Sequence, residues 1–325
     1  MNSDGDTCYI IEYIIQIKKW RDAEIMNVVV ALFPLIILIM MGYGFKRIEF
    51  LTDEFWRGAE KLNYMILFPI LLFNSLAYIK FEVAALTKVL LALLIIIVLS
   101  SLMLWVMKVI FNIPVARFGV YVQSQIRFNT YIGLSITSLL FGTQGMQIFA
   151  MMIAFAIPLV NVISILSFTQ AQQLKPQQIF ISIIKNPLIG GCIVGIIFNL
   201  MQGSLFSGVE QVLKFLASMS LPLGLISVGA ALQFAQLKQD YARLLINTLG
   251  RLIVMPSVAY LICSLLGLSH FETMILVVFF SLPTASAAYI LTRYLKGDSQ
   301  LMASVISLQT LGFAFTFPIL IFLIS

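Results

Sequence analysis

The stretch Leu67-Phe68-Pro69-Ile70-Leu71-Leu72-Phe73 places a proline inside a long apolar run, and Leu221-Pro222-Leu223-Gly224-Leu225 does so again 153 positions later. Pro34 and Pro187, also within apolar runs, have the same separation of 153. A constant offset between matching features indicates an internal repeat. If each copy holds an odd number of membrane-spanning helices, the two copies face opposite ways. That arrangement is typical of secondary transporters, whose site lies between inverted repeats.

The composition predicts a membrane protein that crosses the bilayer many times. The 325 residues are 61% hydrophobic and 10% charged, with a mean hydropathy of +1.02. Soluble domains are about 45–50% apolar and about 25% charged. Three cysteines (Cys8, Cys192 and Cys263) and the single His270 offer neither a disulfide framework nor a metal site. Neither a phosphate-binding loop nor a pair of intramembrane aspartates occurs, so we expect no enzyme, no cofactor and no nucleic-acid partner.

The apolar runs predict ten spanning helices, because each is close to the roughly 20 residues that a bilayer requires. Polar or glycine-containing breaks separate them, and they divide into two sets of five. Their approximate limits are 25–45, 59–79, 84–111, 117–141 and 145–169 in the first half, and 178–201, 211–233, 242–266, 271–293 and 300–324 in the second half.

The chain therefore divides into an extension, two repeats and a linker. We expect repeats at 25–169 and 178–325, joined by a polar linker at 170–177. The extension at 1–24 contains an apolar run that is too short to span a bilayer. It reads either as an interfacial helix or as a translation mis-start ahead of Met26.

Lysine and arginine predict the orientation, because they favour cytoplasmic loops. Twelve fall on the side of the linker and six on the other side. This places the linker in the cytoplasm and both termini outside a cytoplasmic membrane. The twelve are Lys46, Arg47, Arg57, Lys61, Lys108, Arg117, Lys175, Lys185, Lys238, Arg243, Arg293 and Lys296; the six are Lys18, Lys19, Arg21, Lys80, Lys88 and Lys214.

The fourth and ninth segments carry the polar motifs that predict a site. With an offset of 155, Asn129 aligns with Thr284, and both motifs fall near the middle of their segments. Pro283 disfavours a continuous helix, and Asn129 and Thr284 are residue types that cap restarted helices. Such helix starts expose backbone N–H groups and the positive end of the helix dipole. Two of them meeting at mid-membrane predict an anion site, although a simple proline kink is the alternative.

Charges inside the segments agree with an anionic ligand. Arg127 and Arg251 lie within apolar segments, and all fourteen Asp and Glu residues fall in the N-terminal tail or near segment ends. The sequence thus predicts a membrane interior with two arginines and no carboxylate. A buried charge needs a partner. An anionic substrate could be that partner, and carbonyls freed at broken helices are the alternative. Asn161 and Gln309 are further candidates, with interhelical hydrogen bonding as the alternative reading.

Several motifs in this order and spacing resemble the auxin efflux carrier family, which includes bacterial malate and malonate permease-like members. Together they cover roughly residues 26–325. They are Phe33-Pro34, Met41-Gly42-Tyr43, the stretch at 67–73, Arg127-Phe128-Asn129-Thr130-Tyr131-Ile132-Gly133, Ile157-Pro158-Leu159-Val160-Asn161-Val162, Lys185-Asn186-Pro187-Leu188, the stretch at 221–225, Leu282-Pro283-Thr284-Ala285 and Met302-Ala303-Ser304.

The resemblance implies an all-α membrane fold of ten helices in two inverted five-helix repeats, with broken helices four and nine crossing at the substrate site. Helices one, two, six and seven would form a scaffold, and the others a moving transport domain. The implied substrates are organic anions. The oligomeric state stays open, with a homodimer through the scaffold as one alternative. The resemblance places Asn129, Thr130, Pro283, Thr284 and Ala285 at the crossover, with Asn161 beside them.

We therefore expect a secondary carrier of small carboxylates that works by elevator-type alternating access. The candidate binding residues are Arg127, Asn129, Thr130, Asn161, Pro283, Thr284, Ala285 and Gln309, with Arg251 less certain. A co-transported proton or sodium ion stays open. Two alternatives also stay open: a sodium-coupled carrier similar to the bile acid symporters, and a membrane sensor on the same scaffold that does not transport.

Overall fold

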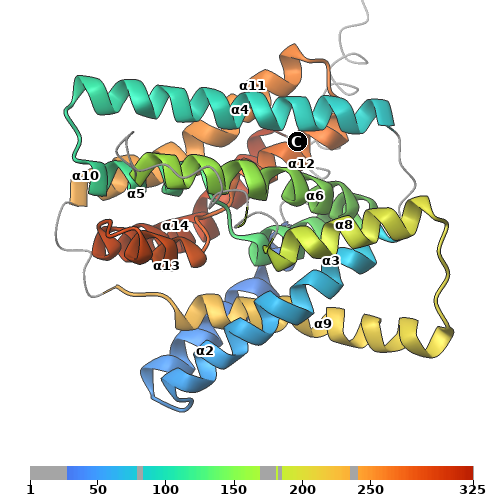
Figure 1. Ribbon diagram of the computed structural model, residues 1–325. Helices are drawn as coiled ribbons and strands as arrows, with labels where there is room; N and C mark the ends of the chain where they lie inside the picture. The colour runs from blue at the N-terminus through green and yellow to red at the C-terminus, as the bar shows by residue number, and fades with distance from the viewer. Residues whose placement is uncertain (1–27, 79–82, 169–180, 182–184, 235–240, 325) are drawn as a thin grey trace, which may run out of the picture.

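The computed structural model describes residues 28–78, 83–168, 181, 185–234 and 241–324, and across these ranges the chain is helical and without strands (Figure 1). The predicted all-α class is confirmed. The extension at 1–24 and the linker at 170–177 lie outside the described residues. In chain order the helices are Val28–Arg47, α2 (Asp53–Leu62), η1 (Asn63–Leu67), α3 (Phe68–Leu76), α4 (Val83–Ile110), α5 (Val115–Ile126), α6 (Thr130–Phe168), α8 (Pro187–Leu200), α9 (Ser207–Ala230), α10 (Tyr241–Leu249), η3 (Gly250–Val254), α11 (Met255–Leu265), α12 (His270–Ser281), α13 (Ala287–Tyr294) and α14 (Ser299–Ile324).

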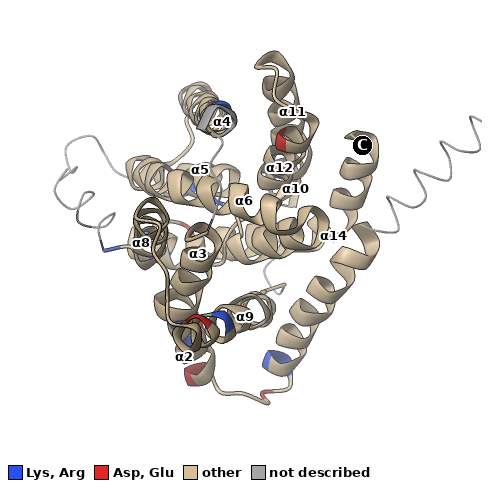
Figure 2. Ribbon diagram, turned by 90° about the vertical axis from the view of Figure 1, so that its right-hand side faces the viewer, with Lys and Arg blue, Asp and Glu red and all other residues tan. Residues whose placement is uncertain are grey.

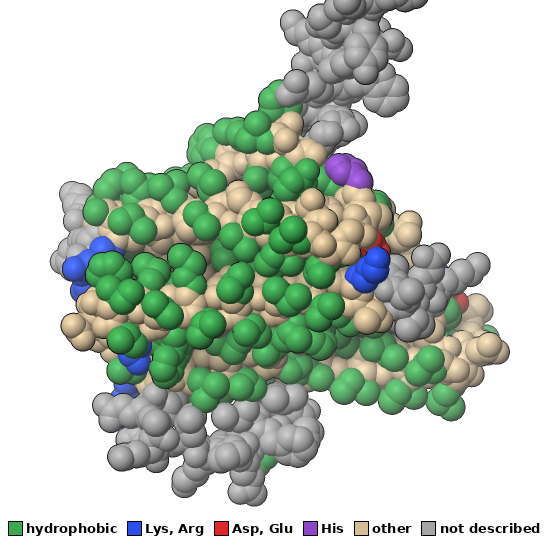
Figure 3. All heavy atoms as spheres, turned by 90° about the horizontal axis from the view of Figure 1, so that it is seen from above, with side chains coloured by type: hydrophobic (Ala, Val, Ile, Leu, Met, Phe, Trp, Pro, Cys, Tyr) green, Lys and Arg blue, Asp and Glu red, His purple; other side chains and the backbone are tan. Residues whose placement is uncertain are grey.

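The helices have the length and surface of membrane-spanning elements. Six helical stretches of the described residues are long and apolar enough to cross a bilayer. Among them α4, with 28 residues, is about 42 Å long at 1.5 Å per residue, which exceeds a hydrocarbon core of about 30 Å. Figure 3 shows hydrophobic side chains across one face of the molecule, between edges that carry charged side chains. These features identify a multi-pass membrane protein.

Within the described residues, each of the ten predicted segments contains one helix or several consecutive helices, but the start of one segment and the continuity of four segments differ from the prediction. The second segment begins at Asp53 rather than near 59, because the Thr52 hydroxyl accepts a hydrogen bond from the backbone N–H of Phe55 at 3.2 Å and caps the helix there. The fourth and ninth segments each consist of two helices. Short π-helical turns, η1 and η3, interrupt the second and eighth segments.

The fourth and fifth segments meet within α6, which is interrupted at Gly142. This residue has φ 62° and ψ −155°, a backbone conformation that is essentially restricted to glycine. The sequence prediction of a break near this glycine is confirmed. A straight helix over the 39 residues of α6 would be about 58 Å long, far more than a bilayer requires.

The packing divides the helices into two groups, which are visible in Figures 1 and 2. In the first group, α3 packs against α8 and α9, and α2 packs against α9. The second group contains α4, α5 and α10 to α14, and α6 contacts both groups. The α3–α8 contact is close because Gly191 lies against the carbonyl oxygen of Pro69, which a Cβ on Gly191 would approach to 2.5 Å. The cavity described next lies between these groups.

Candidate functional site

The first helix break lies between α5 and α6. The backbone leaves helical geometry at Arg127, with φ −79° and ψ 142°, and α6 begins at Thr130. The Asn129 side chain starts the new helix, because its Oδ1 accepts hydrogen bonds from the N–H groups of Tyr131 at 3.1 Å and Ile132 at 3.2 Å. Asn129 therefore caps a restarted helix in the way that its residue type predicts.

The second break lies between α12 and α13. Helix α12 ends at Ser281, Leu282 is extended with ψ 143°, and α13 begins at Ala287. The prediction that Thr284 caps the restarted helix is wrong. Its hydroxyl lies 2.9 Å from the carbonyl oxygen of Ser124 and 2.7 Å from Oε1 of Gln309, so it joins other helices instead of its own.

The two breaks touch each other. The backbone N–H of Asn129 donates to the carbonyl oxygen of Pro283 at 2.8 Å. Beside this bond, the rings of Phe128 and Phe279 lie 4.1 Å apart between centroids. The two non-helical segments, far apart in the sequence, thus cross in the interior of the molecule.

A buried polar network supports the crossing from behind. The Gln309 side chain accepts from the backbone N–H of Thr284 at 2.9 Å and donates to Oδ1 of Asn247 at 3.1 Å. Asn247 in turn donates to the hydroxyl of Ser124 at 2.8 Å. Three predicted site residues therefore lie behind the crossing rather than along the cavity: Pro283, Thr284 and Gln309. The side chain of Gln309 forms hydrogen bonds between helices, which was the alternative reading of this residue.

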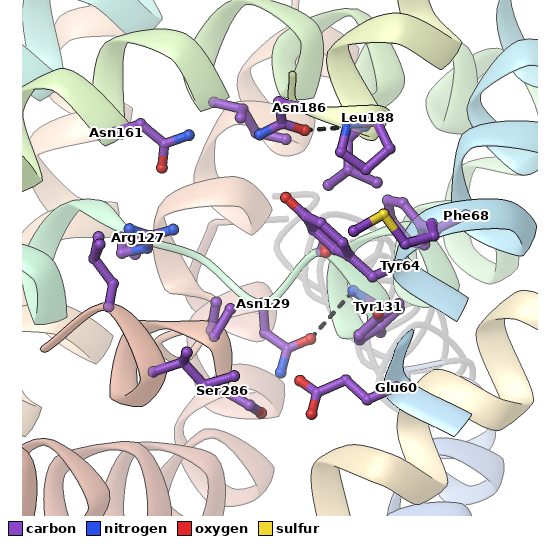
Figure 4. Close-up of a pocket in the computed structure, with 18 of the residues that line it drawn as sticks. Glu60, Tyr64, Phe68, Arg127, Asn129, Tyr131, Asn161, Asn186, Leu188 and Ser286 are labelled. Carbon is purple, nitrogen blue, oxygen red and sulfur yellow. Dashed lines mark hydrogen bonds between the residues drawn. The ribbon is translucent and has the colours of Figure 1, made fainter. Parts of the chain in front are cut away.

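A cavity of about 690 Å³ lies in front of the crossing (Figure 4). Five of the predicted site residues line it: Arg127, Asn129, Thr130, Asn161 and Ala285. The other polar or charged side chains of its wall are Arg57, Glu60, Lys61, Tyr64, Tyr131, Lys185, Asn186, Ser227, Ser286 and Tyr294. The wall thus combines the α5–α6 break with side chains of α2, η1, α9, α13 and the start of α8.

Positive charge predominates in this wall. It contains four basic side chains and one carboxylate, that of Glu60. Arg127 is the basic residue at the crossing itself. Its NH1 group donates to Oε1 of Gln123 at 3.3 Å, and Gln123 is held by a 2.8 Å bond to the hydroxyl of Thr292. The guanidinium is thereby positioned at the cavity by a neutral partner, which leaves its charge available to an anion.

Glu60 was not predicted as a site residue, yet its carboxylate lines the cavity. Because α2 begins at Asp53 and continues into η1, Glu60 lies two turns after the start of this helical segment. It shares the cavity face with Arg57, Tyr64 and Phe68, at the helical spacing that aligns side chains along one face. Thr52 followed by acidic Asp53 and Glu54 is the signal that could have located this helix start.

Two serine hydroxyls of the wall were also missed. The Oγ atoms of Ser227 on α9 and Ser286 before α13 are buried and have no hydrogen-bond partner in the structure. Buried polar groups are usually paired, so unpaired hydroxyls beside a cavity are consistent with a ligand that supplies the missing bond. Serine is too common in the chain for its residue type alone to identify such positions.

Arg251 does not line the cavity. Its side chain is fully buried, and it donates from Nε to the carbonyl oxygen of Leu282 at 2.7 Å, from NH2 to that of Phe279 at 3.4 Å, and from NH1 to that of Gln125. These are carbonyls at the ends of the broken helices, as in the alternative reading of this arginine. Within the described residues, no group of three or more His, Cys, Asp or Glu side chains could hold a metal ion.

Comparison with known proteins finds a family that matches the second half of the chain. Residues 173–321 match the membrane transport protein family, which is the auxin efflux carrier family. The resemblance expected from the sequence motifs is thus confirmed over these residues, which include α8 to α13 and most of α14.

One curated relative is an uncharacterized transporter of the archaeon Methanocaldococcus jannaschii. It is 29% identical over 126 residues, which are 38% of this chain and 41% of that protein. The chain thus matches less than half of the length of this relative.

Proposed function

We propose that this protein is a secondary transporter of small organic anions. The second half of the chain matches the membrane transport protein family, which supports a role in transport. Its substrates would be carboxylates such as malate, malonate or auxin-like acids. The observation that carries the proposal is the cavity at the crossing of two broken helices, whose wall holds four basic side chains and one carboxylate.

The proposed binding site uses three kinds of positive potential. The restarted helices α6 and α13 begin beside the cavity, and the starts of helices favour anions. Arg127 adds a full charge, and the amide groups of Asn129 and Asn161 are able to donate hydrogen bonds to carboxylate oxygens. The unpaired hydroxyls of Ser227 and Ser286 would complete the set. Thr130 and Ala285 line the cavity beside them.

The two helix groups suggest how the substrate would cross the membrane. The helix Val28–Arg47, α2, α3, α8 and α9 would form the fixed scaffold, and α4 to α6 with α10 to α14 would form the moving part. Both breaks belong to the moving part, and the cavity wall on the other side comes from α2 and α9. An elevator motion would carry the bound anion past the scaffold.

The inverted five-helix repeat is part of this proposal. Its support is the position of the breaks, since the residues that end the two half-helices, Arg127 and Leu282, differ by the 155 positions that relate the two halves. Inverted repeats of this kind place the substrate between two half-helix ends and give the two access states.

The charges at the mouth suggest which access state the structure represents. Arg57, Lys61 and Lys185 line the cavity, and all three were assigned to the cytoplasmic side by the distribution of basic residues. The cavity would therefore be open to the cytoplasm, with both termini outside. The membrane potential would then favour export of an anion, by about 2.3 kcal/mol per charge for each 100 mV.

A thermal-shift screen tests the proposed substrate class. Detergent-solubilised protein would be heated with dicarboxylates, aromatic acids and their uncharged amides at equal concentration. A ligand that binds the folded state raises the melting temperature, so at least one acid should stabilise the protein while its amide does not. Equal stabilisation by the acids and their amides would argue against an anion carrier. The absence of stabilisation by any of these compounds would argue against it as well.

A further inference from the structure

Arg251 is a charged side chain buried away from the cavity. Its exposed fraction is 0%, and it is the largest side chain among those that are fully buried. A charge in the membrane interior is retained only where other groups stabilise it. Because it lies behind the crossing, substrate contact does not explain why this charge is present.

The partners of Arg251 belong to two helix ends at once. Gln125 lies in the last turn of α5, and Phe279 and Leu282 lie at the end of α12. All three bonds go to backbone carbonyl oxygens. The carbonyls in the last turn of a helix have no partner within that helix, and the breaks after Ile126 and Ser281 create two such turns inside the membrane.

The number of charges matches. A helix end carries roughly half a negative charge, so the two ends that meet at Arg251 carry about one together. A single guanidinium balances them, and its planar set of donors reaches both. Because Arg251 balances the negative ends of α5 and α12, these ends do not offset the partially positive starts of α6 and α13. Those starts lie on the cavity side.

The local backbone directs Arg251 to this position. It belongs to the π-helical turn η3, which Pro256 follows in the first turn of α11. A π-helical turn inside a longer helix changes the direction of the side chains that follow, and such turns are frequent at functional sites.

We propose that Arg251 is the positioning residue of the crossing, a fixed cation that ties the ends of α5 and α12 together and so maintains the anion affinity of the cavity in front. This inference rests on the proposed anion transport. It differs from a purely structural role, because it requires the charge and not only the volume of the side chain.

Uptake of a labelled dicarboxylate into proteoliposomes would be measured for the wild type, Arg251→Met, Arg251→Lys and the control Arg243→Met. Arg243 is exposed on α10 two turns before Arg251, so its replacement removes a charge of the same helix without touching the crossing. We expect Arg251→Met to raise KM by on the order of tenfold or more, Arg251→Lys to recover much of the loss, and Arg243→Met to match the wild type.

A wild-type KM in folded Arg251→Met, or folded Arg251→Lys no better than Arg251→Met, would overturn the inference. If Arg251→Met does not fold, Arg251→Lys alone tests the inference, because lysine keeps the charge but forms fewer hydrogen bonds. This variant should transport with a moderately raised KM. Complete loss of uptake by folded Arg251→Lys would contradict the inference. A purely structural role would instead lower the amount of folded protein and Vmax at unchanged KM.

Failure of the proposed function is distinguishable, because the wild type would then take up no organic anion. In that case, thermal unfolding without substrate would test whether Arg251 ties the ends of α5 and α12 together. Millimolar guanidinium chloride should raise the melting temperature of Arg251→Ala more than sodium chloride does, and should not do so for Arg243→Ala. Equal effects of the two salts on Arg251→Ala would contradict the proposed role of Arg251 at the ends of α5 and α12.

Discussion

Asn129 combines two tasks at the scale of a single residue. Its Oδ1 starts α6 through bonds to Tyr131 and Ile132, and its backbone N–H holds the other break at Pro283. In Figure 4 its amide nitrogen points toward Glu60 across the cavity. The residue type predicted the cap, but the bond to Pro283 joins positions 154 apart, which no local pattern reveals.

Glu60 is the residue whose charge opposes the proposed ligand. A carboxylate in the wall repels an anion over a short distance, and the repulsion is strong where water is scarce. We predict that Glu60→Gln lowers the KM for dicarboxylate uptake severalfold at neutral pH. The measurement is KM in proteoliposomes at fixed membrane potential.

Glu54→Gln is the matched control for this prediction. Glu54 is exposed in the first turn of the same helix, so its replacement should leave KM unchanged. An unchanged or weaker affinity in Glu60→Gln would show that Glu60 does not face the bound anion. Loss of uptake with intact folding would instead indicate that the carboxylate carries an ion with the substrate.

At the scale of elements, the sequence predicted the interruptions well and their contacts poorly. Proline and a capping asparagine are local signals, so the breaks near Asn129 and Pro283 could be placed without a structure. Thr284 carried a similar local signal, yet Gln309 and the carbonyl of Ser124 bind its hydroxyl. Tertiary partners overrode the cap, and only the fold brings those partners together.

The interruption of α6 at Gly142 gives a prediction for stability. Its backbone conformation is strained for any residue with a Cβ, at a cost of about 1–3 kcal/mol. We expect Gly142→Ala to lower the melting temperature clearly, measured by thermal unfolding in detergent. A Cβ would meet no atom within 4 Å at this position, so the effect would come from the backbone alone.

Gly44→Ala is the control for that measurement. Gly44 also has open space around it but lies within the helix Val28–Arg47. Alanine is favoured over glycine in a helix by about 0.5–1 kcal/mol, so this variant should be neutral or slightly more stable. Equal melting temperatures for the two variants would mean that α6 does not need its break at Gly142.

At the scale of the whole molecule, the proposed motion requires the two helix groups to slide past each other. Phe68 on α3 and Tyr131 on α6 lie on opposite sides of this boundary, with ring centroids 5.0 Å apart. In a variant without its native cysteines, we predict that a cross-link between Phe68→Cys and Tyr131→Cys stops uptake and that reduction restores it.

A cross-link within one group serves as the comparison. Asn63 on η1 and Ser220 on α9 are joined by a 2.8 Å bond between the serine hydroxyl and the asparagine Oδ1, and both belong to the proposed scaffold. Linking cysteines at these two positions should leave uptake largely unchanged. If both cross-links stop uptake equally, the division into a fixed and a moving group is not supported.

The sequence also predicted the general architecture better than the cavity wall. Apolar runs indicated a helical membrane protein, repeated prolines indicated the internal repeat, and the polar motifs of the fourth and ninth segments indicated the residues at the crossing. The contributions of Glu60, Ser227 and Ser286 depend on which faces of α2, α9 and α13 meet, and helix packing determines those faces. Arg251 had two readings, because its position within an apolar segment did not reveal which groups surround its side chain.

The most direct test of the central claim is uptake of a labelled dicarboxylate by proteoliposomes that contain the wild type or Asn129→Ala, with Asn74→Ala as control. Asn74 is a partly buried asparagine of α3 that does not line the cavity. An anion site at the crossing predicts saturable uptake by the wild type and Asn74→Ala, and at least about a tenfold lower Vmax/KM for folded Asn129→Ala, equivalent to about 1.4 kcal/mol. Full uptake by Asn129→Ala would contradict it.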